Sequence, residues 1–170
     1  MRRVLALAAA FPPWVIPWPV GPAPHYTPPA RPAAVAAAAP VGSLHCASSG
    51  PSFRIHLEIF VDRKVVIVPA GIGVADNGCR YPVSTDGPDG IVRVAPGLRL
   101  AEVFRVWGQQ LESHRLGWFT SKTTLRVYVG GKLVHGPAGA IPLTPHAQIV
   151  LELGGYVPPH PFFLFAGGDS

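Results

Sequence analysis

The sequence has few acidic residues and little charge of either sign. Nine Asp and Glu and 14 Lys and Arg stand among 170 residues, so 14% of the chain is charged and the net charge is +5 at pH 7. The basic residues are scattered along the chain and form no run of the kind that a nucleic-acid surface needs. We therefore expect neither paired catalytic carboxylates nor a nucleic-acid partner.

Motifs of the common enzyme classes are also missing. The chain has no Gly-x-Ser-x-Gly turn, no glycine-rich phosphate loop that opens a helix and no Cys-x-x-Cys. Gly71-Ile72-Gly73 follows an extended run but leads into no helical pattern, so we interpret it as a turn. The sequence predicts a protein that is not an enzyme, and no residue is assigned a catalytic role.

Long hydrophobic runs are absent too. The apolar stretch Val4–Phe11 is far shorter than the roughly 20 residues that span a membrane, and prolines follow it at once. Preceded by Arg2 and Arg3, it is typical of a secretory signal peptide. We expect residues 1–23 to direct export to the extracellular space or the cell envelope, without an integral membrane span. The alternative is an apolar tail or a misplaced start codon.

Proline and alanine dominate the next stretch. Residues 24–42 have almost no charge and neither helical nor strand periodicity, which predicts a semi-extended linker. A brief helix within Ala33–Ala39 is the alternative for its middle part. A single domain is expected over residues 43–165, followed by a short tail over residues 166–170.

Cysteine is scarce, with Cys46 and Cys79 as the only two. An even pair in an exported protein normally oxidises, so we expect a disulfide between them; two free thiols that bind a soft metal are the alternative. Closing the loop between them stabilises a fold by about 3 to 4 kcal/mol on the chain-entropy model. The bond would tie the entry of the first strand to a glycine-rich loop over residues 70–90.

Periodicity defines the elements of the domain. Alternating apolar residues predict a hairpin with strands over 53–61 and 64–69. An apolar face at helical spacing between Leu100 and Leu111 predicts a helix of about three turns; a stop at Gly108, with Leu111 already in the following turn, is the alternative. Further strands are predicted over 91–94, 123–129, 132–134 and 148–153. This order is that of an α+β, β-grasp-like fold, a mixed sheet crossed by one helix, with the first and last strands adjacent. A small β-sandwich is the alternative.

Several short segments carry a family resemblance. They are His56-Leu57, Val68-Pro69-Ala70-Gly71-Ile72-Gly73, Cys79, Gly90-Ile91-Val92-Arg93-Val94, Val106-Trp107-Gly108 and Pro158-Pro159-His160-Pro161-Phe162. From about His45 onward the chain resembles a family of uncharacterised secreted or envelope-tethered domains of bacteria and archaea. That family has a His-rich entry into its first strand, a His-Thr-His-Asp loop and a Trp-Gly helix end. The resemblance implies export and architecture, and no established activity.

The imidazoles of that family imply a transition-metal site, because neutral histidines on neighbouring strands and a loop are ligands for copper or zinc. Here Ser84-Thr85-Asp86 stands where the family has His-Thr-His, and Arg93 replaces a further histidine. The resemblance therefore implies a weakened site whose remaining candidate ligands are His56, His45 and Asp86. Arg93 would repel a cation there. An ordinary strand-surface role for His56 is the alternative.

Two classes of function follow. The first is a small extracellular binding module in which Ser84, Thr85 and Arg93 of the loop region contact a metal, an anion or a peptide; its alternative is a copper- or zinc-binding protein. The second is a structural domain that docks an unidentified extracellular or envelope partner through the apolar stretch Tyr156–Phe165. The more ordinary expectation for that stretch is that it folds back over the sheet.

Overall fold

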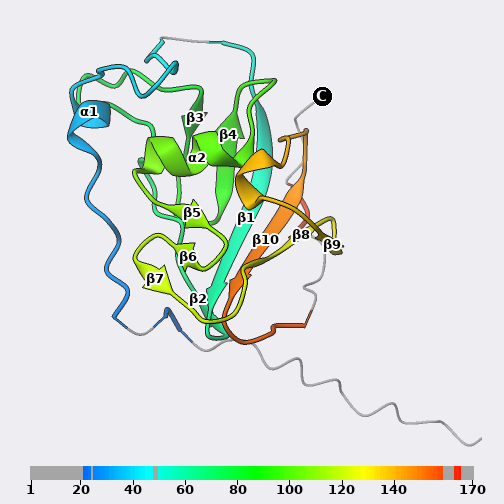
Figure 1. Ribbon diagram of the computed structural model, residues 1–170. Helices are drawn as coiled ribbons and strands as arrows, with labels where there is room; N and C mark the ends of the chain where they lie inside the picture. The colour runs from blue at the N-terminus through cyan, green and yellow to red at the C-terminus, as the bar shows by residue number, and fades with distance from the viewer. Residues whose placement is uncertain (1–20, 24, 48–49, 159–162, 166–170) are drawn as a thin grey trace, which may run out of the picture.

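The long strand β1 (Phe53–Val61) lies at the centre of the fold (Figure 1). The computed structural model describes residues 21–23, 25–47, 50–158 and 163–165. The alternating apolar side chains of β1 form one buried face, on which Ile55, Leu57 and Ile59 are at most 2% exposed. Most of the expected signal segment and the whole of the tail over residues 166–170 lie outside the described residues.

Strand β1 belongs to a seven-stranded mixed sheet in the order β3-β4-β1-β10-β8-β9, with β2 also paired to β1. The other strands are β2 (Lys64–Val65), β3 (Val83–Ser84), β4 (Ile91–Val94), β8 (Arg126–Val129), β9 (Lys132–Val134) and β10 (Gln148–Leu153). Strands β1 and β10 are parallel, with Leu57 paired to Ile149 and His56 to Gln148. Because paired residues point to the same side, Leu57 and Ile149 lie on the inner face and His56 and Gln148 on the outer face.

Helix α2 (Leu100–Trp107) packs on the inner face, where Val103 and Phe104 join the strands in one core. The Arg99 N–H donates a hydrogen bond to the Glu102 carboxylate at 2.9 Å, which fixes the start of the helix. Gly108 ends it in the left-handed conformation, with a φ of 73°. The helix therefore ends at Gly108, the stop that the sequence offered, and Leu111 lies beyond it.

A second, three-stranded sheet follows the helix. It consists of β5 (Leu111–Glu112), β6 (Arg115–Leu116) and β7 (Phe119–Thr120). The remaining elements are helix α1 (Ala33–Ala36) and a 3₁₀ turn, η1 (Ala138–Ala140). The strands of the small sheet have two residues each, which is too short to show a periodicity in the sequence.

The predicted fold class is wrong. The sequence predicts an α+β, β-grasp-like sheet crossed by one helix, whereas the regular structure of the described residues is mostly sheet, with 32% strand and 11% helix. Its described part has a seven-stranded mixed sheet, a separate three-stranded sheet and two α-helices. The parallel contact of β1 with β10 is present, but the short strands β3 and β4 widen the sheet beyond β1 and the second sheet adds to the helix side.

The described part of residues 21–42 lies against the domain, as the blue segment of Figure 1 shows. Val35 of α1 is fully buried in the common core, and Ala23 is 3% exposed. The Ala23 N–H donates to the Val65 carbonyl at 2.8 Å, which places a further backbone segment beside β2. Val35 of the predicted linker thus packs into the core, and Ala23, the last residue of the expected export segment, is buried as well.

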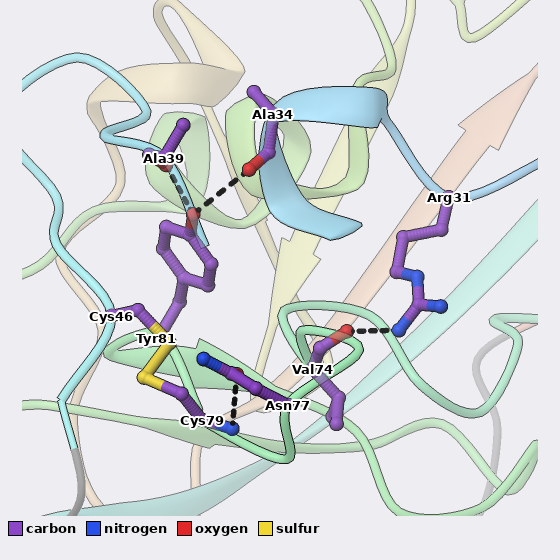
Figure 2. Close-up of a disulfide and its surroundings, with 8 residues drawn as sticks. All are labelled: Arg31, Ala34, Ala39, Cys46, Val74, Asn77, Cys79 and Tyr81. Atoms are coloured by element: carbon purple, nitrogen blue, oxygen red, sulfur yellow. Dashed lines mark hydrogen bonds between the residues drawn. A yellow bond between two sulfur atoms is a disulfide. The ribbon is translucent and has the colours of Figure 1, made fainter. Parts of the chain in front are cut away.

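The two cysteines form a disulfide, so the predicted pairing is confirmed (Figure 2). The Cα atoms of Cys46 and Cys79 are 5.8 Å apart, within the usual range for such a bond. Next to it, the Tyr81 hydroxyl donates to the carbonyl of Ala39. The disulfide and this hydrogen bond hold the segment before β1 against the loop that leads into β3.

The C-terminal stretch covers part of the outer face of the sheet. Phe163 stacks on His56, and its carbonyl accepts a hydrogen bond from the Gln148 side chain at 2.7 Å. Phe165 lies against His146, with ring centroids 4.8 Å apart. For these described residues, the expectation that the stretch folds back over the sheet is confirmed; residues 159–162 lie outside the described part.

Across the described ranges, the helices are all too short or too polar to cross a membrane.

Candidate functional site

A hollow of about 660 Å³ opens beside β3 and β4, on the side where the segment before β1 passes. Its polar lining comes from Ser52, Arg80, Ser84, Asp86 and Arg93, and proline and alanine residues form most of the remaining wall. A smaller hollow of about 130 Å³ shares Ser84, Asp86 and Arg93 with it. The two hollows therefore lie side by side, with these three residues between them.

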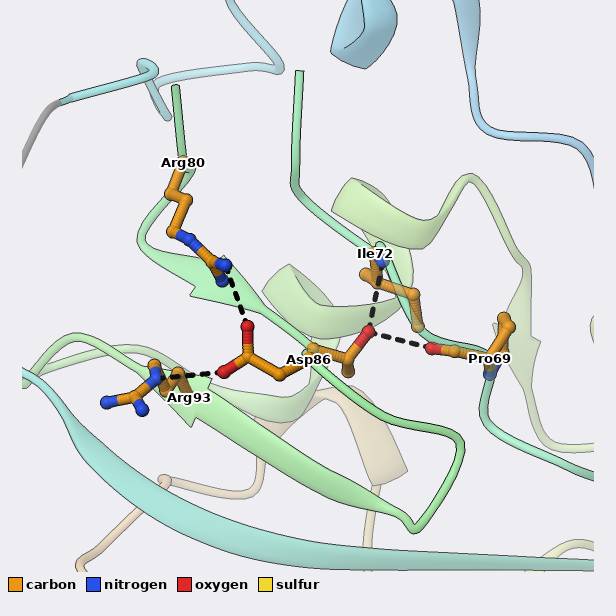
Figure 3. A network of polar contacts seen from close by, with 6 residues as sticks. Pro69, Ile72, Arg80, Asp86 and Arg93 are labelled. Atoms are coloured by element: carbon orange, nitrogen blue, oxygen red, sulfur yellow. Dashed lines mark hydrogen bonds and ion pairs between the residues drawn. The ribbon is translucent and has the colours of Figure 1, made fainter. Parts of the chain in front are cut away.

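Asp86 lies between two arginines at the centre of this region (Figure 3). One carboxylate oxygen is 2.7 Å from Arg80 Nη2 and the other is 3.3 Å from Arg93 Nε. Burial acts to raise the pKa of the Asp86 carboxyl, but hydrogen bonds and charge from Arg80, and then from Arg93, outweigh it and lower that pKa. Asp86 is consequently ionised at neutral pH.

A third arginine completes the cluster. Arg54 of β1 pairs directly with Arg93 of β4 in the antiparallel ladder, so both side chains leave the sheet on the same side. Both line the smaller hollow. This register brings two positively charged side chains to the same side of the sheet.

The disulfide fixes the position of Arg80. Ala47 and Arg80 follow the two cysteines directly, and the Ala47 N–H donates to the Arg80 carbonyl at 2.9 Å. On the other side, the Cys79 N–H donates to the Asn77 side chain at 3.0 Å (Figure 2). The backbone that carries Arg80 is thus held on both sides of the bond.

The two hydroxyl residues of the predicted binding loop have different surroundings. The Thr85 hydroxyl donates to the Pro69 carbonyl at 2.7 Å and accepts from the Ile72 N–H at 3.0 Å, and Thr85 is 2% exposed. Its side chain is occupied in holding the glycine-rich loop to β3. Ser84, also 2% exposed, pairs with Arg93 across the strands and lines the hollow.

The candidate metal ligands are not assembled. His45 is exposed next to the disulfide, His56 lies on the outer face of β1 beneath Phe163, and Asp86 is paired with two arginines. Within the described part of the chain, no group of three or more His, Cys, Asp or Glu residues is placed to hold a metal ion. Copper or zinc binding by these residues stays a prediction that this geometry does not favour.

His56 has an acidic neighbour. Its Nδ1 lies 3.7 Å from a carboxylate oxygen of Glu58, which is two residues further along the same face of β1. Burial raises the pKa of the Glu58 carboxyl, and the charge of His56 counteracts part of that shift. Both residues line a hollow of about 210 Å³ that also reaches Asp89.

Sequence reasoning missed two members of the arginine cluster, Arg54 and Arg80. The sequence places Arg54 on the polar face of a predicted strand. Its position opposite Arg93 depends on the strand register, which the sequence pattern does not show. Arg80 directly follows Cys79. The predicted disulfide therefore indicated that the backbone at Arg80 is held in place.

Comparison with protein-family models, with curated proteins and with solved structures finds no match to this chain. The resemblance to secreted, histidine-rich domains therefore stays a prediction.

Proposed function

We propose that this protein is an exported, non-catalytic binding domain whose ligand presents a negatively charged group to Arg54, Arg80 and Arg93. The observation that carries the proposal is the direct opposition of Arg54 and Arg93 on β1 and β4 at the wall of a hollow. A negatively charged group at this wall is attracted by both guanidinium groups.

The chemistry of the lining supports an anionic ligand. Guanidinium groups offer planar pairs of N–H donors that match carboxylate and phosphate oxygens, and such charge-assisted hydrogen bonds are stronger than neutral ones. The two hollows are lined by three arginines and two carboxylates, Asp86 and Asp89, of which Asp86 binds Arg80 and Arg93. The volume of the larger hollow, about 660 Å³, is in the range of small-ligand sites.

Asp86 then acts as an internal competitor. The side chains of Arg80, Arg93 and Asp86 are 45%, 51% and 56% exposed, and ion pairs at such exposure are weak. An incoming carboxylate or phosphate therefore competes with Asp86 for Arg80 and Arg93 at little cost. Export is supported by the disulfide, which is compatible with an oxidising compartment.

Isothermal titration calorimetry with inorganic phosphate and with citrate tests this proposal on the oxidised protein. We expect binding that weakens as salt rises. Arg93→Gln should weaken it by about tenfold or more, because a charge-assisted contact is lost. Asp86→Asn should tighten it by about tenfold, because the internal competitor is neutralised.

Arg63→Gln is the matched control, since Arg63 is an exposed arginine in the turn between β1 and β2. It should leave the affinity unchanged. Absence of heat with either anion, or equal losses in the Arg63 and Arg93 variants, would contradict the proposal. Binding of zinc or copper that His56→Ala abolishes would favour the metal-binding alternative instead.

A further inference from the structure

The segment over residues 26–32 contacts the domain at every third residue. Its prolines restrict the backbone to extended angles, and Pro32 has a φ of −55° and a ψ of 138°, near those of polyproline II. Tyr26, Pro29 and Pro32 are half-buried, whereas the residues between them are exposed. Because polyproline II has three residues per turn, these three side chains lie on one face, and that face is the one that meets the domain.

Aromatic side chains of the domain receive this face. The ring centroid of Tyr26 lies 6.3 Å from that of Trp118 and 6.2 Å from that of Phe119. Pro29 lines an apolar hollow together with Trp107 and Trp118. Only about 20 Å³ of this hollow stays open, so the segment fills most of the space between α2 and the three-stranded sheet.

Pro32 lies against Gly108, at the end of α2. A Cβ atom at Gly108 would lie 2.6 Å from Cγ of Pro32, so another residue there would clash with the proline ring. The positive φ of Gly108, 73°, also favours glycine. The end of the helix is therefore shaped to admit a proline ring.

Side chains hold this segment in place. Within the described part of the chain, residues 27–31 form no backbone hydrogen bond with the domain, as is usual for polyproline II. The Arg31 side chain donates to the Val74 carbonyl and pairs with Asp76. Proline-rich peptides dock into aromatic grooves in the same manner. Such a contact requires only suitable side chains at the right spacing, which a different chain can also supply.

We propose that this surface, the polyproline groove formed by Trp107, Gly108, Trp118 and Phe119 with Asp76 beside it, binds proline-rich segments of another protein. Residues 26–32 are its ligand within the same chain. The partner segment has an aromatic residue or proline at every third position and a basic residue before the last proline. An intramolecular ligand competes at an effective concentration on the order of 1 mM, so it sets the threshold that a partner must overcome. The groove does not include the arginine cluster, so this proposal is independent of anion binding.

Fluorescence polarisation with a labelled peptide of residues 25–33 tests the proposal on the full chain. The wild-type protein should bind it weakly, with a Kd of about 1 mM or above, because the intramolecular segment competes. The double variant Pro29→Gly, Pro32→Gly, called the release variant, loses the two rings that hold that segment. It should bind the peptide at least about tenfold more tightly than the wild type.

A peptide in which Pro29 exchanges places with Ala30, and Pro32 with Ala33, has the same composition but the wrong spacing. It should bind the release variant at least about tenfold more weakly. Trp118→Ala in the release variant should weaken binding of the original peptide by about fivefold or more. Leu133→Ala is the matched control, because Leu133 and Trp118 are both 45% exposed and Leu133 lies on β9; it should leave the affinity unchanged.

Circular dichroism verifies that the release variant is folded. If it is not, Arg31→Ala takes its place, because this substitution removes only exposed contacts. That variant should bind the peptide about threefold more tightly than the wild type. The proposal would be overturned by a folded variant that binds no more tightly than the wild type, or by equal binding of the two peptides.

Discussion

The imidazole of His56 lies nearly parallel to the phenyl ring of Phe163, with centroids 3.9 Å apart and an angle of 15° between the planes. The two residues belong to the first strand and the last described segment of the domain, so this stack closes the chain over the outer face of the sheet. Gln148 reinforces the contact through its hydrogen bond to the Phe163 carbonyl.

Phe163→Ala should lower the free energy of unfolding by about 1 to 2 kcal/mol, because it removes a half-buried aromatic ring and its stacking contact with His56. Urea unfolding measures the change. Leu164→Ala is the control: Leu164 is the next residue and is 87% exposed, so its truncation should change stability by less than about 0.5 kcal/mol. Equal effects of the two substitutions would show that the segment is not held by Phe163.

Arg126 and Glu152 form the most deeply buried ion pair of the described residues. Arg126 Nε lies 3.1 Å from a carboxylate oxygen of Glu152, whose side chain is 2% exposed. Arg126→Met should cost about 3 kcal/mol, because it leaves a buried carboxylate without this partner. Arg105→Met, which breaks an exposed pair with Glu102, should cost less than about 1 kcal/mol. Chemical denaturation of both variants tests the difference, and similar losses would refute it.

The disulfide should support both stability and the arginine cluster. The bonded cysteines are 33 residues apart, and loss of a bond of this span costs about 3 to 4 kcal/mol on the chain-entropy model. The double variant Cys46→Ser, Cys79→Ser should melt at a lower temperature and bind phosphate more weakly, because Arg80 follows Cys79 directly. Calorimetry measures both quantities. Unchanged phosphate affinity in a folded double variant would show that the bond does not position Arg80.

Elements with a long periodicity were predictable from the sequence. The alternation over residues 53–61 predicted β1, the glycine pair at Gly130-Gly131 located the β8–β9 turn, and the expectation of export together with two cysteines predicted the disulfide. The first two signals are local in the sequence. The third depends on there being only two cysteines, so that each has only one possible partner.

The fold class and the arginine cluster depend on tertiary packing, which local patterns do not encode. Two-residue strands such as β5 and β6 have no period, so the second sheet was missed. The Pro/Ala-rich composition of residues 24–42 predicts a linker, yet the branched residue Val35 is fully buried. Arg54 and Arg93 meet only because β4 pairs antiparallel with β1 in one particular register.

Ionisation of Tyr26 should contribute to the loss of folding stability at alkaline pH. Its hydroxyl donates to the Ile67 carbonyl, and burial raises the pKa of this phenol from 10.0 to about 12. An acid whose pKa is raised by folding contributes stability that is complete below pH 10 and is lost as pH rises towards 12. Tyr26→Phe should lower stability at about pH 8 by about 1 kcal/mol, through loss of the hydrogen bond, and should flatten the decline between about pH 10 and about pH 12. Urea unfolding at about pH 8 and about pH 11 measures both effects.

Tyr156→Phe is the control, because Tyr156 is 53% exposed, and it should leave the decline in stability between about pH 10 and about pH 12 unchanged. If the Tyr26→Phe variant lost stability with rising pH as steeply as the wild type, groups other than Tyr26 would cause the loss of stability at alkaline pH.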